Sequence, residues 1–316
     1  MIQRRITLRD FIDLEDKLIA TGTGEFKDVV MRIVESCLEI AGELEMAELS
    51  TNMGESHSTN IFGEVQKKLD IFSNDRLVKN LSESTAVYSI ASEEMDTTDF
   101  VNKQQGRYTV FFDPIDGSSN LASHISLGTL FSIFSKEDKI LLPGNQQLAA
   151  GYMYYSNTIE FVYTSRIGKV NIFTLDQSSG EFILTHKNIR MPSIGKIYSI
   201  NEGRELLFSK SLQNYLKMLK EHTYKLRYVG SMAADIHRTL MEGGIFLYPS
   251  DKENPNGKLR LLFEVNPVAM IVENAGGLAR VGTENPLDIT PESTDQRVPV
   301  VLGSKREVEY FLNMMM

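Results

Sequence analysis

The sequence predicts a mixed α/β (α+β) protein with two lobes, residues 1–190 and 191–316. Three observations favour this fold class. Helical patterns over residues 25–49 and 64–83 precede a series of short strand-like runs. After Pro192 strand and helix patterns alternate, as they do in α/β units. A chain of 316 residues is also long enough to bury the cores of two lobes.

The first lobe begins with two predicted helices. In residues 25–49, apolar side chains recur at helical spacing on one face. Cys37 lies on that face, so we expect it to be a small buried apolar side chain rather than a nucleophile. A polar, glycine-containing loop is expected over residues 50–63, with His57 solvated, and a second helix over 64–83.

Strands complete the first lobe, and strands and helices alternate in the second. The strand-like runs of the first lobe are residues 86–92, 108–112, 129–134, 151–155, 159–164 and 169–174. Those of the second are residues 197–200, 225–230, 245–249 and 258–263. Two helices, AADIHRTLMEGG and NPVAMIVENAGG, each end at a glycine pair, which is a common helix stop.

Composition excludes several classes of function. The net charge of −9 disfavours a nucleic-acid partner, because such a partner needs a basic face. With one cysteine no intrachain disulfide can form, so a cytoplasmic setting is expected. No apolar run reaches 18 residues, and the first 20 residues lack the apolar core of a signal peptide, so no membrane partner is expected.

The segment Tyr108–Asn120, YTVFFDPIDGSSN, is the most informative part of the chain. A strand-like run ends at Asp113, and Asp116 follows on a turn stiffened by proline. Two carboxylates on such a turn suit Mg²⁺, which prefers oxygen ligands. The backbone N–H groups of the following Gly-Ser-Ser suit a phosphate oxygen. The alternative is an ordinary Asp/Gly turn between a strand and a helix.

Three predicted strands end in acids. Glu93 and Glu94 follow the first, Asp113 and Asp116 the second, and Glu264 another. Carboxyl ends of strands are where ligands gather in open α/β sheets, so we expect the five side chains to converge. Converging anions repel unless cations neutralise them, and two or three Mg²⁺ ions would do so. The alternative is that these acids are separate surface residues.

The sequence resembles the class I fructose-1,6-bisphosphatases from about Gly22 to Gly303. FDPIDGSSN alone is shared with a wider superfamily that includes the lithium-sensitive inositol phosphatases. The segments 227–249 and 257–277 are specific to the fructose-bisphosphatase branch. The resemblance implies a layered αβαβα sandwich of the sugar-phosphatase type. It also implies Mg²⁺-dependent hydrolysis of the 1-phosphate of D-fructose 1,6-bisphosphate in gluconeogenesis, with Mn²⁺ able to substitute.

The resemblance also assigns roles to individual residues. The implied metal ligands are Glu93, Glu94, Asp113, the carbonyl of Ile115, Asp116 and Glu264. Asp70 and Glu94 match the acids that orient and deprotonate the attacking water. The implied substrate-binding residues are Asp116, Gly117, Ser118 and Ser119 at the 1-phosphate, and Asn201, Tyr228, Tyr248 and Lys258 at the 6-phosphate and sugar. Arg227 matches an arginine supplied by a neighbouring subunit, which implies a homo-oligomer that is at least a C2 dimer and is expected to be a homotetramer.

The family also binds AMP, an inhibitor, at the turn before its first long helix. The matching residues here are Gly22, Thr23, Gly24, Glu25, Arg107 and Tyr108. Lys27 stands where a small hydroxylated residue is usual, and Ser135 where an arginine is usual. We therefore expect AMP inhibition to be weaker than is typical, or absent, and a glycine-rich helix cap without a ligand remains open. Arg204 replaces a common tyrosine, which leaves part of the 6-phosphate contact open.

Other functions remain as alternatives. A related bisphosphatase, such as one that hydrolyses sedoheptulose 1,7-bisphosphate, could use the same residues. Inositol-phosphate hydrolysis is disfavoured because that substrate would leave the residues assigned to the 6-phosphate without a ligand. A non-catalytic sugar-phosphate sensor would be expected to lack a metal ligand, and all five carboxylates are present.

Overall fold

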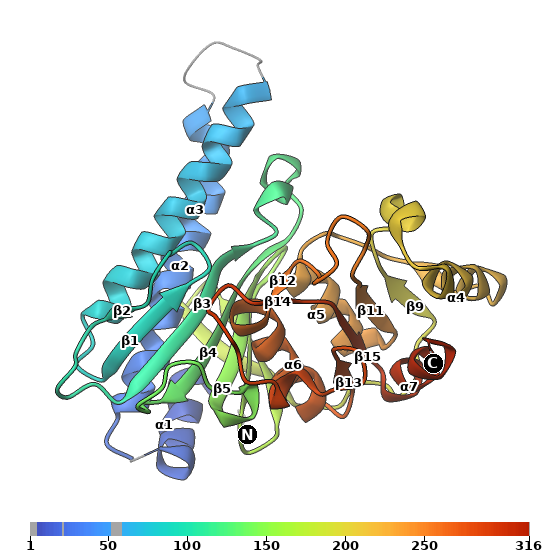
Figure 1. Cartoon of the computed structure of the whole chain (residues 1–316). Coiled ribbons are helices and arrows are strands. Elements are labelled where there is room, and N and C mark those ends of the chain that lie inside the picture. Colours follow the sequence, from blue (N-terminus) through green and yellow to red (C-terminus); the bar gives the residue numbers. More distant parts are fainter. Residues whose placement is uncertain (1–4, 21, 52–58, 316) are drawn as a thin grey trace.

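The computed structural model describes residues 5–20, 22–51 and 59–315, with side chains except at 47–51 and 59–67. His57, predicted to be solvated, lies outside the described residues. Two sheets lie side by side with helices around and between them (Figure 1). No helix in the described part of the chain is long and apolar enough to cross a membrane.

The first unit is built on an eight-stranded sheet of order β2-β1-β3-β4-β5-β6-β7-β8. Its strands are β1 (Val87–Ser92), β2 (Asp99–Phe100), β3 (Tyr108–Asp116), β4 (Leu127–Ser135), β5 (Gln147–Tyr155), β6 (Ile159–Ser165), β7 (Val170–Asp176) and β8 (Glu181–Ile189). Its helices are α1 (Leu8–Ile19), α2 (Glu25–Thr51) and α3 (Thr59–Ser82), and a 3₁₀ helix η1 (Ser118–Ser123) follows β3. The long pair α2 and α3 runs along one face of this sheet (Figure 1).

The second unit is built on a five-stranded sheet of order β10-β9-β11-β15-β13. Its strands are β9 (Ile197–Ser199), β10 (Lys225–Leu226), β11 (Ile245–Tyr248), β13 (Leu278–Arg280) and β15 (Val300–Gly303). Its helices are α4 (Lys210–Glu221), α5 (Met232–Glu242), α6 (Asn266–Asn274) and α7 (Lys305–Met315). A separate two-stranded sheet pairs β12 (Leu259–Arg260) with β14 (Arg297–Val298).

Side-chain alternation along the strands places each sheet between two helical layers. In β4, Phe131 packs with α1, α2 and α3, whereas the preceding Leu130 packs with α5 and α6. In β11, Phe246 faces α5 and α6, and Leu247 faces α4 and α7. The order of layers is therefore helix, sheet, helix, sheet, helix. This is the predicted αβαβα sandwich.

Several predicted elements are confirmed and others need correction. Cys37 is fully buried in the core, as expected. The strand predicted over 258–263 is wrong beyond Arg260, because residues 261–265 form a π-helical turn, η4 (Leu261–Val265), that runs into α6. This segment is buried on all sides, and an uninterrupted apolar run cannot distinguish a strand from a buried helix.

Other boundaries also differ from the sequence prediction. The strand expected to end at Asp113 continues to Asp116, with a register shift between these two residues. The strand predicted over 225–230 covers only β10, and the loop predicted over 50–63 is helical from Thr59. The helices α1, α4 and α7 and the strand β8 were not predicted. They are amphipathic or half-exposed elements whose stability depends on tertiary packing.

Candidate active site

Parallel pairing of β1 with β3 brings two predicted acids to the same edge of the large sheet. Ser92 lies opposite Phe112 in the ladder, and the backbone N–H of Glu93 donates to the carbonyl of Phe112 at 3.1 Å. Glu93 and Asp113 therefore leave neighbouring strand ends side by side. Because both strands run in the same direction, their next residues share one edge, as the sequence analysis expected.

Glu264 joins this pair from the π-helical turn η4. One carboxylate oxygen from each of Glu93, Asp113 and Glu264 lies within 4.8 Å of the others. Asp113 and Glu264 are 5% and 7% exposed. Burial raises the pKa of both well above the ordinary value, and the charge of Glu93 raises each further. Glu93 Oε2 is buried without a hydrogen-bond partner. Three such oxygens fit a hard divalent cation.

Arg260 is a neighbour of this cluster that the sequence analysis did not single out. Its guanidinium contacts Glu93 and donates through Nε to Asp295 at 2.7 Å. Its backbone N–H donates to Glu264 Oε2 at 2.6 Å. The only sequence signal was its position four residues before Glu264. Arg260 offsets part of the negative charge that Glu93, Asp113 and Glu264 concentrate.

Asp116 is bound differently from the other acids. Its Oδ2 accepts from the Ser231 hydroxyl at 2.6 Å and from the Ala233 N–H at 2.8 Å, and Oδ1 accepts from the Met232 N–H at 3.0 Å. Asp116 thus holds the N-terminus of α5 against the end of β3. Burial raises its pKa although these hydrogen bonds lower it. Gly117 is required here, because its φ is +80° and a Cβ would lie 2.5 Å from the Ser231 Cβ.

The turn after Asp116 opens the 3₁₀ helix η1, and α3 brings Asp70 beside it. The pKa of Asp70 is raised to about 6, chiefly by burial and also by the nearby charge of Glu94, although a hydrogen bond with Ser118 lowers it. The structure therefore brings Asp70 near both Glu94 and Ser118, three residues that the family resemblance assigns to the reacting water and the 1-phosphate. Glu94 and Ser119 are exposed, and Ser118 is half-buried.

A small cavity lies in the second unit. It measures about 40 Å³, and its lining residues include Asn201, Arg204, Tyr248, Asp251 and Lys258. Three of these are predicted 6-phosphate residues.

Tyr248 relates that cavity to the acidic cluster, because it lines the cavity. Burial raises the pKa of Tyr228, and the neighbouring Tyr248 adds to the effect. Burial raises the pKa of Tyr248, and the charge of Glu264 adds to the effect, so Tyr248 lies within electrostatic reach of the acids. In contrast, Arg227 is exposed, and its Nη1 donates to the carbonyl of Leu226. It does not line the cavity of its own chain.

The predicted AMP turn is occupied by acidic side chains of the same protein. The N–H of Gly24 donates to Asp16 Oδ2 at 2.9 Å, and Asp16 is only 3% exposed. Glu25 accepts from the Thr23 hydroxyl at 2.9 Å and pairs with Arg107 at 3.1 Å.

The nearby cation at position 27 is also paired, since Lys27 contacts Asp13 at 2.8 Å. Asp16 lies on α1, which was not predicted as a helix, so nothing in the sequence had connected it to the turn. Tyr108 is buried and Ser135 is exposed.

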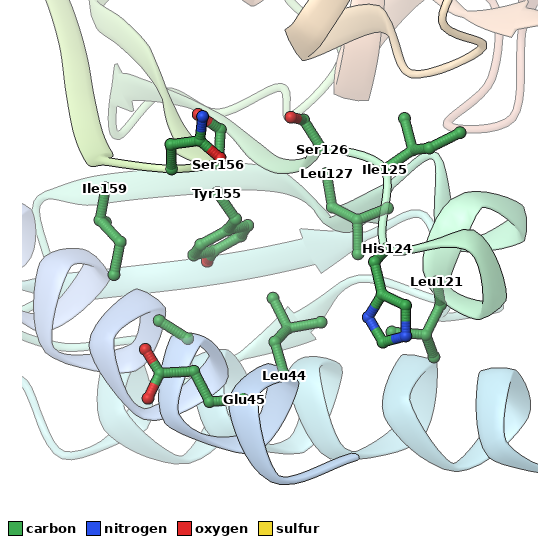
Figure 2. Close-up of a pocket in the computed structure, with 12 residues that line it drawn as sticks. Leu44, Glu45, Leu121, His124, Ile125, Ser126, Leu127, Tyr155, Ser156 and Ile159 are labelled. Atoms are coloured by element: carbon green, nitrogen blue, oxygen red, sulfur yellow. The ribbon is translucent and has the colours of Figure 1, made fainter. Parts of the chain in front are cut away.

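A further hollow of about 280 Å³ lies behind η1 (Figure 2). Leu44 and Glu45 of α2 lie along one side of it. Leu121 of η1 and His124 lie at one end and Ile159 at the other, with Tyr155 between them. None of the predicted site residues lines it.

Together these features define a class of site. Buried carboxylates at neighbouring strand ends, a turn of backbone N–H groups and an adjoining pocket with a lysine are typical of metal-assisted chemistry on phosphate esters. The chain belongs to the fructose-1,6-bisphosphatase family. Residues 6–187 match the family model described as "Fructose-1-6-bisphosphatase, N-terminal domain", and residues 191–316 match the one described as "Fructose-1-6-bisphosphatase, C-terminal domain".

Individual relatives are similar over nearly the full chain. "Fructose-1,6-bisphosphatase, cytosolic" of Brassica napus is 42% identical, over 96% of this chain and 93% of its own. "Fructose-1,6-bisphosphatase class 1" of Sulfurihydrogenibium sp. (strain YO3AOP1) is also 42% identical, over 98% and 97%. The crystal structure of Leishmania major fructose-1,6-bisphosphatase in holo form superposes with a TM-score of 0.90 at 35% identity, covering 99% of each chain.

Proposed function

We propose that this protein hydrolyses the 1-phosphate of D-fructose 1,6-bisphosphate to fructose 6-phosphate and phosphate, a reaction of gluconeogenesis. One observation carries the proposal: Tyr248 lines the cavity that contains Lys258, and it also lies within reach of the charge of Glu264 in the acidic cluster. A substrate with phosphates at both ends can reach both places at once. Membership of the fructose-1,6-bisphosphatase family supports the same activity.

Divalent ions are part of the proposal. Glu93, Asp113 and Glu264 offer oxygen ligands within 4.8 Å of one another, and we assign Glu94, Asp116 and the carbonyl of Ile115 to the same site. Two or three Mg²⁺ ions, or Mn²⁺ in their place, would stabilise the negative charge that develops on the phosphoryl group. The protein's own share is to hold the carboxylates of Glu93, Asp113 and Glu264 close together.

Asp70 is the proposed general base, with Glu94 beside it. A carboxyl group with a pKa of about 6 is largely deprotonated at neutral pH, yet is a stronger base than an ordinary aspartate. It lies within hydrogen-bonding distance of Ser118, at the turn proposed to hold the 1-phosphate. The backbone N–H groups of Gly117, Ser118 and Ser119 would donate to the phosphate oxygens.

The distal phosphate is assigned to the cavity that contains Asn201, Tyr248 and Lys258. Lys258 supplies a positive charge, and the tyrosine and amide groups supply directional donors. Sedoheptulose 1,7-bisphosphate remains the second candidate substrate, because it presents the same two phosphates on a longer chain. A non-catalytic sensor is not favoured, because the full set of acids is retained.

Assembly and regulation are further parts of the proposal. Arg227 is exposed and outside its own cavity, which fits a residue that completes a neighbour's site in a homotetramer. We propose AMP inhibition weaker than is typical of the family, because Asp16 already accepts from Gly24. We also propose a cytoplasmic location, as for the relatives named cytosolic, and two lobes divided at residue 190.

A phosphate-release assay tests the proposal directly. Purified protein is supplied with Mg²⁺ and a panel of fructose 1,6-bisphosphate, sedoheptulose 1,7-bisphosphate, fructose 1-phosphate and inositol 1-phosphate. We expect fructose 1,6-bisphosphate to give the highest kcat/KM, and a chelator to abolish the activity. No phosphate release from any bisphosphate would overturn the proposed function.

A further inference from the structure

The wall of the distal cavity contains an ion-paired arginine, Arg204, that no assigned role explains. It lies on a short 3₁₀ helix, η3 (Glu202–Leu207), directly after Asn201. Its Nε donates to Asp251 Oδ2 at 2.8 Å, and its Nη2 donates to Glu253 Oε2 at 2.7 Å. The Arg204 side chain is 26% exposed and that of Asp251 only 5%. The bond to Asp251 is therefore partly shielded from solvent, whereas the bond to Glu253 is exposed.

Asp251 also shapes the loop that leads to Lys258. Its Oδ1 accepts from the N–H groups of Glu253 and Asn254, both at 2.9 Å, and from Asn254 Nδ2 at 3.0 Å. One carboxylate oxygen thus organises the loop while the other binds Arg204. Because both oxygens are hydrogen-bonded, the carboxylate has a single preferred orientation. That orientation fixes the position of the Arg204 guanidinium.

Two more contacts fix the same loop. The N–H of Lys252 donates to the carbonyl of Leu207 in η3 at 3.2 Å. Gly257 has a φ of +79°, and a Cβ there would lie 2.4 Å from the backbone of Pro299. The loop is therefore attached to η3 at one end and pressed against the 298–299 backbone at the other. Arg204 connects the side of the cavity that carries Asn201 to the side that carries Lys258.

Charge and volume indicate what this connection does. Arg204 is paired with two carboxylates, so its charge is already neutralised and Lys258 remains the cation for a distal phosphate. The cavity of about 40 Å³ is small, since a single water needs roughly 10–15 Å³ on the same scale. A neutralised Arg204 adds little electrostatic attraction for a phosphate. Its ion pairs instead hold the walls of this small cavity at a fixed separation.

We propose that Arg204 is a positioning residue that determines specificity. By holding η3 to the 251–257 loop, it keeps Asn201 and Lys258 at the separation that suits the distal phosphate of a six-carbon sugar bisphosphate. A seven-carbon substrate carries its distal phosphate one carbon further from the acidic cluster, so walls that are held in one place favour the six-carbon substrate. This inference rests on the proposed function, because it concerns the substrate of the same site.

The test compares Arg204→Ala and Arg204→Lys with Glu253→Gln, a control at a side chain that is 64% exposed. For Arg204→Ala we expect the KM of fructose 1,6-bisphosphate to rise about tenfold, as for loss of a coupled ion pair, with kcat within about twofold. The ratio of kcat/KM for sedoheptulose 1,7-bisphosphate to that for fructose 1,6-bisphosphate should rise. Arg204→Lys, which retains a cation for Asp251, should fall between Arg204→Ala and wild type, and Glu253→Gln should stay near wild type.

A binding measurement separates this inference from the proposed function. Fructose 6-phosphate carries only the distal phosphate, and its binding is followed by calorimetry without any turnover. We expect Arg204→Ala to bind it about tenfold more weakly, and Asp251→Asn to show the same loss without further loss in the double variant. An unchanged KM and unchanged fructose 6-phosphate affinity in folded Arg204→Ala would overturn the inference. A wild type that binds fructose 6-phosphate but releases no phosphate would overturn the proposed function alone.

Discussion

Replacing Asp113 by asparagine should stabilise the metal-free protein while it removes the activity. Asp113, Glu93 and Glu264 place carboxylate oxygens within 4.8 Å of one another. At that distance and an effective dielectric constant of about 20, two unit charges repel by about 3.5 kcal/mol. The neutral asparagine amide would remove two of the three repulsions and keep an oxygen that can accept from the Ile115 N–H, which now donates to Asp113 Oδ1 at 3.1 Å.

The observed increase in the free energy of unfolding should be smaller than this repulsion and should depend on pH. The pKa values of Asp113, Glu93 and Glu264 are raised in the folded protein, chiefly by burial, so the folded state binds protons more tightly than the unfolded state. Stability is therefore greatest below the unfolded pKa of about 4 and declines as pH rises through the folded values. Protonation relieves part of the repulsion as the pH falls, and Arg260 offsets more. We expect a gain of about 1–3 kcal/mol for Asp113→Asn at pH 8 and almost none at pH 5.

Thermal unfolding in the presence of a chelator measures this effect. One kcal/mol corresponds to roughly 2–4 °C for domains of moderate size, so the Tm of Asp113→Asn should exceed that of wild type by about 2–12 °C at pH 8. Added Mg²⁺ should raise the Tm of wild type and leave that of the variant nearly unchanged. Glu221→Gln, at a side chain 61% exposed, is the control and should have little effect at either pH. A lower Tm for metal-free Asp113→Asn at pH 8 would show that repulsion is not the dominant force in the cluster.

Three other outcomes are expected. Asp70→Asn should reduce kcat by about 10²-fold or more, and it should remove an acidic limb near pH 6 from the pH–rate profile. A variant with wild-type kcat and an unchanged acidic limb would exclude Asp70 as the base. Asp16→Ala should make the enzyme more sensitive to AMP by freeing the N–H of Gly24, whereas equal inhibition of both proteins would mean that this turn does not bind the phosphate. Mixing Arg227→Ala subunits with inactive Asp113→Asn subunits should restore activity in hybrid oligomers. Hybrids that stay inactive, or a wild type that is active as a monomer in light scattering, would refute the shared site.

Local chemistry made much of the candidate site predictable. The segment from Asp113 to Ser119 joins two acids to a glycine turn within a few residues. A metal and phosphate site can therefore be predicted there without knowledge of the fold. The proximity of Glu93 and Asp113 was also expected, because both follow strand-like runs and ligands gather at the carboxyl ends of strands. Glu264 was expected at the right place for the wrong reason, since it lies on a π-helical turn instead of a strand end.

Contacts between distant segments could be found only in the tertiary structure. Asp116 binds Ser231 across 115 positions, Arg204 binds Asp251 across 47, and Arg260 contacts Glu93 across 167. Even Asp16 and Gly24, eight positions apart, meet only because α1 packs beside the start of α2.

The amino-acid sequence by itself therefore determined the fold class, the chemical nature of the site and most of its acids. These follow from the spacing of apolar residues and from ligand types, both of which are local properties of a chain. Which charges neutralise one another was decided by the tertiary structure. A hydrogen bond or ion pair requires two groups within a few ångströms, and only packing of the layers brings such groups together from distant positions.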